Sequence, residues 1–268
     1  IIEMSHRSPE YAAMHAETKA LLRELMEIPE DYEILFIQGG GSLQFLMTAA
    51  NFFTNKRAAY ANTGVWAKKA MAEAKRFGET YEACTSADKN HSYIPQELTI
   101  KPDTAYLHIT ANNTIYGTQW QNFPEVSVPV ICDMSSDILS RPVDVKKFSL
   151  IYAGAQKNLG PAGVVIVIVK KAFLETARTG LPPMLSYQNY ADNDSLYNTP
   201  PVFAIYMVNK TLHWIKEQGG VKAIAARNRE KAQLIYDVID ASRGFYRGHA
   251  EKNSRSLMNI TFNLPTQE

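Results

Sequence analysis

The feature that most constrains the fold is an unbroken apolar run from Val164 to Val169, made only of Val and Ile. Side chains branched at Cβ pack well on a pleated strand, and a run without polar alternation is typical of a strand covered on both faces. The run is much shorter than the roughly 18 apolar residues that a membrane-spanning helix needs. It therefore predicts a buried strand in a sheet that carries helices on both sides.

Shorter runs of the same kind recur along the chain, and helical patterns separate them. We predict further strands at 34–37, 58–61, 80–84, 105–109, 128–132 and 150–153. Apolar residues at helical spacing predict helices over 8–26, 43–52 and 65–76. Strands that alternate with helices predict an α/β fold with a mixed, mostly parallel central sheet flanked by helices.

After residue 170 the pattern changes. Helices are expected at 171–178, 202–217 and 220–241, a long polar loop at 187–199, and a new strand at 256–263. In the last of these helices we place five residues on the apolar face: Val221, Ile224, Leu234, Ile235 and Val238. We expect a large domain over 1–250 and the beginning of a small C-terminal α+β domain over 251–268, with segments missing at both ends.

Composition excludes several classes of protein. The chain of 268 residues is 46% hydrophobic, which excludes intrinsic disorder, and its net charge of +1 offers no attraction to nucleic acid or to an anionic membrane. Cys84 and Cys132 are too few for a disulfide scaffold and lack the spacing of metal ligands. We interpret them as reduced thiols of a cytoplasmic protein.

The residues that indicate chemistry are Asp133 and Lys157. The first ends an apolar run and the second follows the next run, inside a turn rich in Gly and Ala. Both are expected at the edge of the sheet where α/β proteins bind ligands. A partly desolvated lysine can form an imine, and an aspartate can keep a ring nitrogen protonated, as pyridoxal phosphate enzymes require. For an isolated pair, a loop-capping aspartate and a solvated lysine would be the simpler interpretation.

A glycine-rich turn, Gly39 to Ser42, lies between a predicted strand and a predicted helix. Backbone N–H groups at such a helix start can bind an anion. The spacing matches neither the Walker A motif nor the Rossmann G-x-G-x-x-G motif. A single phosphate is therefore favoured over a nucleotide.

Several longer motifs occur together in one order. They are Met4-Ser-His-Arg-Ser8, Gly39-Gly-Gly-Ser-Leu-Gln-Phe45, Asn112-Asn-Thr-Ile-Tyr-Gly117, Ser140-Arg-Pro142, Tyr152-Ala-Gly-Ala-Gln-Lys-Asn-Leu-Gly-Pro-Ala-Gly163 and Tyr197-Asn-Thr-Pro-Pro201. With them the chain resembles, over essentially its whole length, the phosphoserine aminotransferases, which are fold type I, class V pyridoxal phosphate enzymes. The resemblance implies that Asp133 and Lys157 are functional.

The resemblance also implies roles for further residues. Lys157 would bear pyridoxal 5'-phosphate through an imine and shuttle a proton, and Asp133 would pair with the ring nitrogen. Seven others would bind the cofactor: Gly41, Ser42 and Gln156 around the phosphate, Trp66 stacked on the ring, Thr114 near the ring, and Asn198 and Thr199 reaching the cofactor of the neighbouring subunit. The enzyme would then be a homodimer with composite sites.

His6 and Arg7 match the family's residues that bind the acidic group of the substrate. Ser42 and Asn113 stand where some members carry Arg and Glu, and the family's remaining substrate-binding residues lie beyond this chain. The reaction implied is transamination between L-glutamate and 3-phosphohydroxypyruvate in serine biosynthesis, with a related role in pyridoxine biosynthesis. The alternatives are another class V aminotransferase, such as the alanine–glyoxylate type, or a non-catalytic chain that retains the fold. A cysteine desulfurase is disfavoured, because Gln156 stands where those enzymes carry His.

Overall fold

The computed structural model describes residues 3–54 and 57–266. Its centre is a seven-stranded sheet. In spatial order the strands are β1 (Tyr32–Ile37), β9 (Val165–Lys170), β8 (Leu150–Gly154), β7 (Val130–Asp133), β4 (Thr104–Thr110), β2 (Arg57–Asn62) and β3 (Thr80–Thr85). Only β9 runs against its neighbours, and the other adjacent pairs are parallel. The predicted mixed, mostly parallel sheet is confirmed, and the apolar run that predicted it is an inner strand.

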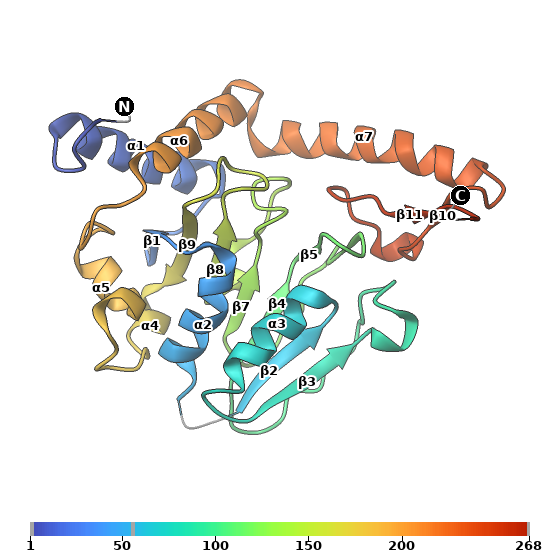
Figure 1. Cartoon of the computed structure of the whole chain (residues 1–268), viewed down its shortest axis with the longest axis horizontal. Coiled ribbons are helices and arrows are strands. Elements are labelled where there is room, and N and C mark those ends of the chain that lie inside the picture. The colour runs from blue at the N-terminus through green and yellow to red at the C-terminus, as the bar shows by residue number, and fades with distance from the viewer. Residues whose placement is uncertain (1–2, 55–56, 267–268) are drawn as a thin grey trace.

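Helices cover both faces of this sheet (Figure 1). α1 (Pro9–Leu25) and α6 (Val202–Glu217) pack against each other over one face. The other face carries α2 (Gly40–Phe52), α3 (Val65–Ala74), α4 (Lys171–Leu174) and α5 (Tyr187–Asp192). Short 3₁₀ helices occur at Ala87–Lys89, Val145–Lys147, Pro183–Leu185 and Lys252–Ser254. None of the helices in the described ranges is long and apolar enough to span a bilayer.

The starts of α1 and α2 follow from local chemistry. Ser8 caps α1 by accepting the backbone N–H of Tyr11 at 3.2 Å, and Pro9 occupies the first helical position, as the sequence predicts. α2 begins after Gly39, whose φ of 91° is left-handed. A Cβ at this position would also collide with the side chain of Leu43. Only glycine therefore allows β1 to turn so sharply into α2.

Two predictions after β9 are wrong in extent. The helix expected at 171–178 ends at Leu174. The polar stretch 187–199 is not a continuous loop, because Tyr187–Asp192 form α5. Ser186 caps α5 by accepting the N–H of Asn189, and the helix buries Tyr187 and Tyr190 one turn apart. Two aromatic anchors thus order a segment whose composition is typical of a loop.

The strand expected at 256–263 is also mostly wrong. Only Phe262–Asn263 (β11) are in a strand, paired with Arg247–Gly248 (β10). Ser256 Oγ accepts the backbone N–H groups of Met258 and Asn259 at 3.0 and 2.9 Å. A serine side chain that bonds nearby backbone in this way competes with the hydrogen bonds of a strand. The boundary expected at residue 250 remains a prediction, and the β10–β11 pair crosses it.

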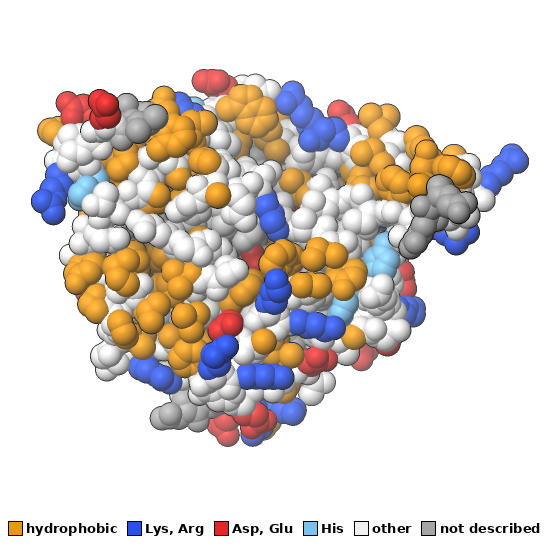
Figure 2. Space-filling view, in the orientation of Figure 1, with side chains coloured by type: hydrophobic (Ala, Val, Ile, Leu, Met, Phe, Trp, Pro, Cys, Tyr) orange, Lys and Arg blue, Asp and Glu red, His pale blue; other side chains and the backbone are white. Residues whose placement is uncertain are grey.

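The apolar face predicted for α7 (Gly220–Ala241) is correct only in the first turns. Val221 and Ile224 are buried, but Leu234, Ile235 and Val238 are 70%, 47% and 57% exposed. The second half instead buries Ala232, Tyr236 and Ile239 against Tyr246, Leu257 and Ile260. Figure 2 shows hydrophobic side chains gathered at this end of the molecule. The position of the 246–260 segment, rather than hydrophobicity, selects the buried side of the helix.

A short hairpin, β5 (Asn112–Asn113) and β6 (Thr118–Gln119), was not predicted as strands. It follows directly from the end of β4 and is fully buried at both strands. Trp120 N–H donates to the carbonyl of Ala111, which continues the pairing. The hairpin projects at the end of the sheet where β4 and β7 finish (Figure 1).

The contact between α1 and α6 generates a stability prediction. Leu212 on α6 is fully buried in the core on that face. Leu212→Ala should lower the free energy of unfolding by about 2–5 kcal/mol, since it removes apolar contacts and leaves a cavity. Urea unfolding measures this. The exposed Glu217→Ala on the same helix should change it by less than about 0.5 kcal/mol. Equal effects would contradict the burial of Leu212.

Candidate active site

Four of the predicted site residues meet at the edge where the parallel strands end. Asp133 is the last residue of β7, and Lys157 lies in the turn after β8. The Lys157 Nζ donates to Thr114 Oγ1 in the β5–β6 hairpin at 2.7 Å. The same Nζ lies 5.3 Å from the centre of the Trp66 ring, at the start of α3. Residues from β7, the β5–β6 hairpin and α3 thus lie near the amine that the turn after β8 carries.

The environment of Lys157 favours the neutral amine. Desolvation lowers the pKa of Lys157 below its ordinary value, and the charges of Asp133 and Asp137 oppose the shift in part. A neutral amine is both a nucleophile and a base.

Asp133 is buried, with 7% of its surface exposed. Desolvation raises the pKa of its carboxyl, while hydrogen bonds from Ser135, the charge of Lys157 and a hydrogen bond from Tyr152 act in the opposite direction. Its Oδ1 accepts the Ser135 N–H at 2.9 Å. The geometry suits a carboxylate that would hold a positively charged group, because a buried charge is stable only with partners.

The start of α2 lies beside this carboxylate. A Cβ on Gly41 would lie 3.5 Å from Ser135 Oγ, so the helix start approaches the turn after β7. No described side chain caps α2 at Gly39, which leaves its first N–H groups free for an anion. Ser42 is exposed on the same turn. Gln156 is exposed and folds its amide back towards Gly154. These positions are compatible with a phosphate site.

Asn198 and Thr199 lie near the turn that leads into α2. The carbonyl of Thr199 accepts the Gln38 side chain at 2.7 Å, and Gln38 directly precedes Gly39. The Thr199 side chain is exposed and that of Asn198 is half-buried. The predicted role of these residues at a neighbouring subunit's cofactor stays a prediction.

His6 and Arg7 precede α1 and are not brought to the lysine of their own chain. In Figure 1 the N-terminal segment lies apart from α3 and β5, which carry Trp66 and lead to Thr114. Arg7 is exposed, and its backbone N–H donates to Ser5 Oγ. A substrate contact by Arg7 stays a prediction.

Sequence reasoning missed the residues that fix the turn after β7. Ser135 Oγ accepts the N–H of Gly154 at 3.0 Å, which ties this turn to β8. Asn158, next to Lys157, donates to the carbonyl of Ile138 at 2.6 Å. Tyr152 stands beside Asp133 in the parallel register. The period of two along β8 could have placed Tyr152 on the face of the site, but no motif indicated it.

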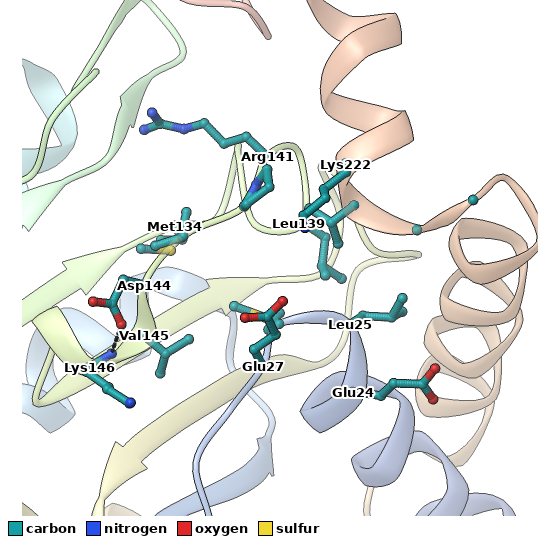
Figure 3. A pocket seen from close by; sticks show the side chains of 16 residues that line it. Glu24, Leu25, Glu27, Met134, Leu139, Arg141, Asp144, Val145, Lys146 and Lys222 are labelled. Atoms are coloured by element: carbon teal, nitrogen blue, oxygen red, sulfur yellow. Dashed lines mark hydrogen bonds between the residues drawn. The ribbon is translucent and has the colours of Figure 1, made fainter.

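A cavity on the other side of the turn after β7 is separate from these residues. It measures ≈ 510 Å³ and lies between the end of α1, the segment 139–146 and the start of α7 (Figure 3). Glu24, Glu27, Asp144, Lys146 and Lys222 line it, but neither Asp133 nor Lys157 does. Arg141 directs its guanidinium away from this cavity, to the carbonyls of Trp120 and Gln121.

Comparisons with known proteins agree with this geometry. The family model "Aminotransferase class-V" matches residues 2–267. The phosphoserine aminotransferase of Bacillus subtilis is 57% identical over 270 residues, covering 100% of this chain and 75% of that protein. The crystal structure of a phosphoserine aminotransferase from Trichomonas vaginalis, described as bound to PLP, superimposes with a TM-score of 0.94 at 37% identity, covering 100% of this chain and 77% of that one.

A more distant structure shares only the fold. The alanine–glyoxylate aminotransferase of Nostoc sp. superimposes with a TM-score of 0.78, covering 99% of this chain and 74% of that one, but is 17% identical. The fold and the family model together define the chain as a class V aminotransferase. Within that class, the chain belongs to the phosphoserine aminotransferase family. The resemblance read from the motifs is confirmed.

The buried Asp137 generates a prediction about pH. Desolvation raises the pKa of Asp137 to about 6, against the charge of Arg141 and a hydrogen bond from Gln119. The folded state then binds the proton more tightly than the unfolded state, so ionisation destabilises the fold as the pH rises from about 4 to 6. Asp137→Asn cannot ionise. Its stability relative to the wild type should rise over that window by up to about 3 kcal/mol.

Chemical denaturation at several pH values measures this difference in the free energy of unfolding. The contributions of titratable groups that both proteins share cancel in the difference. The exposed Asp144→Asn serves as control and should show no such trend. A constant difference between Asp137→Asn and the wild type from pH 4 to 7 would contradict the raised pKa.

Proposed function

We propose that this protein transfers the amino group of L-glutamate to 3-phosphohydroxypyruvate, giving O-phospho-L-serine and 2-oxoglutarate, with pyridoxal 5'-phosphate as cofactor. The observation that carries the proposal is the partly desolvated Lys157 amine, held by Thr114 beside the Trp66 ring at the edge of the sheet where Asp133 is buried. The 57% identity to the Bacillus subtilis phosphoserine aminotransferase over 100% of the chain supports the choice of substrate.

The residues of the site fit this cofactor. Lys157 would hold its aldehyde carbon, and Asp133 would face the ring nitrogen. The indole Nε1 of Trp66 is buried and has no hydrogen-bond partner among the described residues, although a buried indole N–H usually has one, so this donor is available to a bound group. Gly41, Ser42 and Gln156 would surround the phosphate, since the uncapped start of α2 offers N–H groups there.

Pyridoxal phosphate supplies an electron sink that stabilises negative charge at the substrate Cα. The chain's own residues do the rest. Lys157 Nζ removes and returns a proton at Cα, for which an amine of lowered pKa is suited. Asp133 holds the proton on the ring nitrogen, Thr114 orients the amine, and Trp66 excludes water from one face.

We also propose that the enzyme is a homodimer in which each site takes residues from both subunits. Three of the predicted contacts support this. The N-terminal segment that carries Arg7 lies apart from α3 and β5 (Figure 1), and the side chains of Asn198 and Thr199 are half-buried and exposed. Arg7 would bind the acidic substrate in the partner's site, since guanidinium matches carboxylate and phosphate geometry.

A cytoplasmic location is consistent with the free thiols of Cys84 and Cys132. The second candidate function is transamination between alanine and glyoxylate, which the shared fold of the Nostoc sp. enzyme allows. Those substrates carry no phosphate. Comparing activity with 3-phosphohydroxypyruvate and with glyoxylate therefore separates the two functions.

The first functional prediction concerns Lys157. Lys157→Ala should lower the turnover of glutamate and 3-phosphohydroxypyruvate by at least about 10²–10⁴-fold and abolish the visible absorbance of the lysine–cofactor imine. Lys68→Ala, an exposed lysine on α3, is the control and should leave the absorbance unchanged. An active Lys157→Ala protein would refute the assignment.

The second prediction tests the composite site. We expect Lys157→Ala and a double variant Asn198→Ala/Thr199→Ala each to be nearly inactive, and a mixture of the two to recover part of the activity after subunit exchange. Each mixed dimer would contain one site with an intact lysine and an intact partner loop. Unchanged inactivity, despite mixed dimers seen by native mass spectrometry, would argue against shared sites.

The same mixing experiment shows whether Arg7 acts in the site of its own subunit or in that of the partner. Arg7→Ala alone should weaken the use of acidic substrates about ten- to a hundredfold, the value of a charge-assisted bidentate contact. When the Arg7→Ala protein is mixed with the Lys157→Ala protein, each mixed dimer contains one site that combines the Lys157 of the first subunit with the partner's Arg7. That site should show normal specificity. If Arg7 acts within its own subunit, mixing restores nothing.

A further inference from the structure

Beneath the site, Asp133 belongs to a row of buried polar side chains on one face of the sheet. Tyr152 on β8 is aligned with Asp133 on β7, so their side chains stand on the same face. A hydrogen bond from Tyr152 is the weakest of the effects that lower the pKa of the neighbouring Asp133 carboxyl. The Tyr152 hydroxyl lies 2.9 Å from His108 Nε2 on β4. His108 and Tyr152 have no exposed surface.

The direction of these hydrogen bonds follows from counting protons. When Asp133 is ionised its carboxylate only accepts, so the single hydroxyl proton of Tyr152 is then directed to Asp133. The Tyr152 oxygen must then accept the proton of His108 Nε2. Burial lowers the pKa of His108 to about 3, so the imidazole is neutral and carries one proton. Its Nδ1 is then an acceptor, and it has no partner among the described residues.

In this row of Asp133, Tyr152 and His108, only Asp133 can carry a charge, and the groups around the row are as follows. His108 is stacked on Tyr60, with ring centres 5.2 Å apart, and the Tyr60 hydroxyl is bonded to Tyr106. Around Asp133 lie the Ser135 N–H, Lys157, the like charge of Asp137 and the Cys132 thiol, whose pKa burial raises. Tyr187, from α5, faces Tyr152 and bonds Gln44 of α2.

We propose that His108 and Tyr152 are positioning residues: their chain of hydrogen bonds, from His108 Nε2–H to Tyr152 and from the Tyr152 O–H to Asp133, keeps Asp133 ionised and aimed at the ring nitrogen of the cofactor. The inference rests on the proposed function, since it assigns a role towards pyridoxal phosphate. Desolvation favours a neutral Asp133, which could not hold a pyridinium proton by charge. Each donor aimed at the carboxylate opposes that effect.

The test uses Tyr152→Phe, reconstituted with pyridoxal phosphate labelled with ¹⁵N in the ring. The ¹⁵N chemical shift reports whether the ring nitrogen is protonated. Loss of one hydrogen bond to a charged group should lower the pKa of the ring nitrogen by about one to two units relative to the wild type. Turnover should fall without a matching rise in KM.

Tyr106→Phe is the matched control. Tyr106 is equally buried on the same sheet face, and its hydroxyl is hydrogen-bonded to Tyr60 at 2.8 Å rather than to Asp133. It should lose comparable stability but leave the ¹⁵N titration unchanged. Equal titration curves for Tyr152→Phe and the wild type would overturn the inference while leaving the aminotransferase function intact.

A second pair of variants tests the far end of the chain. His108→Gln retains an N–H donor near the position of Nε2 and should keep part of the wild-type titration. His108→Phe has no donor and should shift it in the same direction as Tyr152→Phe. Identical titrations for His108→Phe and the wild type would also overturn the inference. A wild-type protein that takes up no pyridoxal phosphate would overturn both the inference and the proposed function.

Discussion

The turn that follows β7 is the part of the structure on which the site depends. Consecutive residues of this turn bind different segments: Ser135 accepts the N–H of Gly154 at the end of β8, Ser136 exchanges hydrogen bonds with Asn112 of β5, and Asp137 accepts from Gln119 of β6. Asn158, in the turn that carries Lys157, donates a hydrogen bond to the carbonyl of Ile138 and so connects that turn to the same network. Because these bonds are buried, breaking one leaves an unsatisfied polar group, which costs about 1–3 kcal/mol.

This network places charged groups where an apolar sheet alone would exclude them. Asp133 and Asp137 are buried, and Lys157 is exposed but partly desolvated; in each case desolvation is the first cause of the shift in pKa. The shifts favour a neutral lysine and resist the ionisation of both acids. A site with these properties binds and orients a charged, planar cofactor through partners that are already in place. Its rigidity comes from the strands, and its chemistry comes from the turns at their ends.

Much of the fold could be predicted because buried segments have a recognisable pattern of apolar residues in the sequence. The continuous run at 164–169 indicated an inner strand, and Ser8 with Pro9 indicated the start of α1. The errors occur where the packing partners of a segment, rather than its hydrophobic periodicity, determine its conformation or its buried side. α7 carries two apolar sides, and the segment 246–260 selects the one with Ala232, Tyr236 and Ile239. The segment 256–260 is irregular because Ser256 engages its backbone.

The sequence by itself determined the family, because several of its motifs are specific to that family, and it predicted Asp133 and Lys157 as the residues that carry the chemistry. It also determined that parallel strands would bring their ends to one edge. Only the tertiary structure decided that Thr114 and Trp66 surround the lysine and that Tyr152 links Asp133 to His108. These contacts join residues between 19 and 91 positions apart, and the order of strands in the sheet, β8–β7–β4–β2, creates them. Local spacing cannot encode such contacts, since they depend on which strands become neighbours.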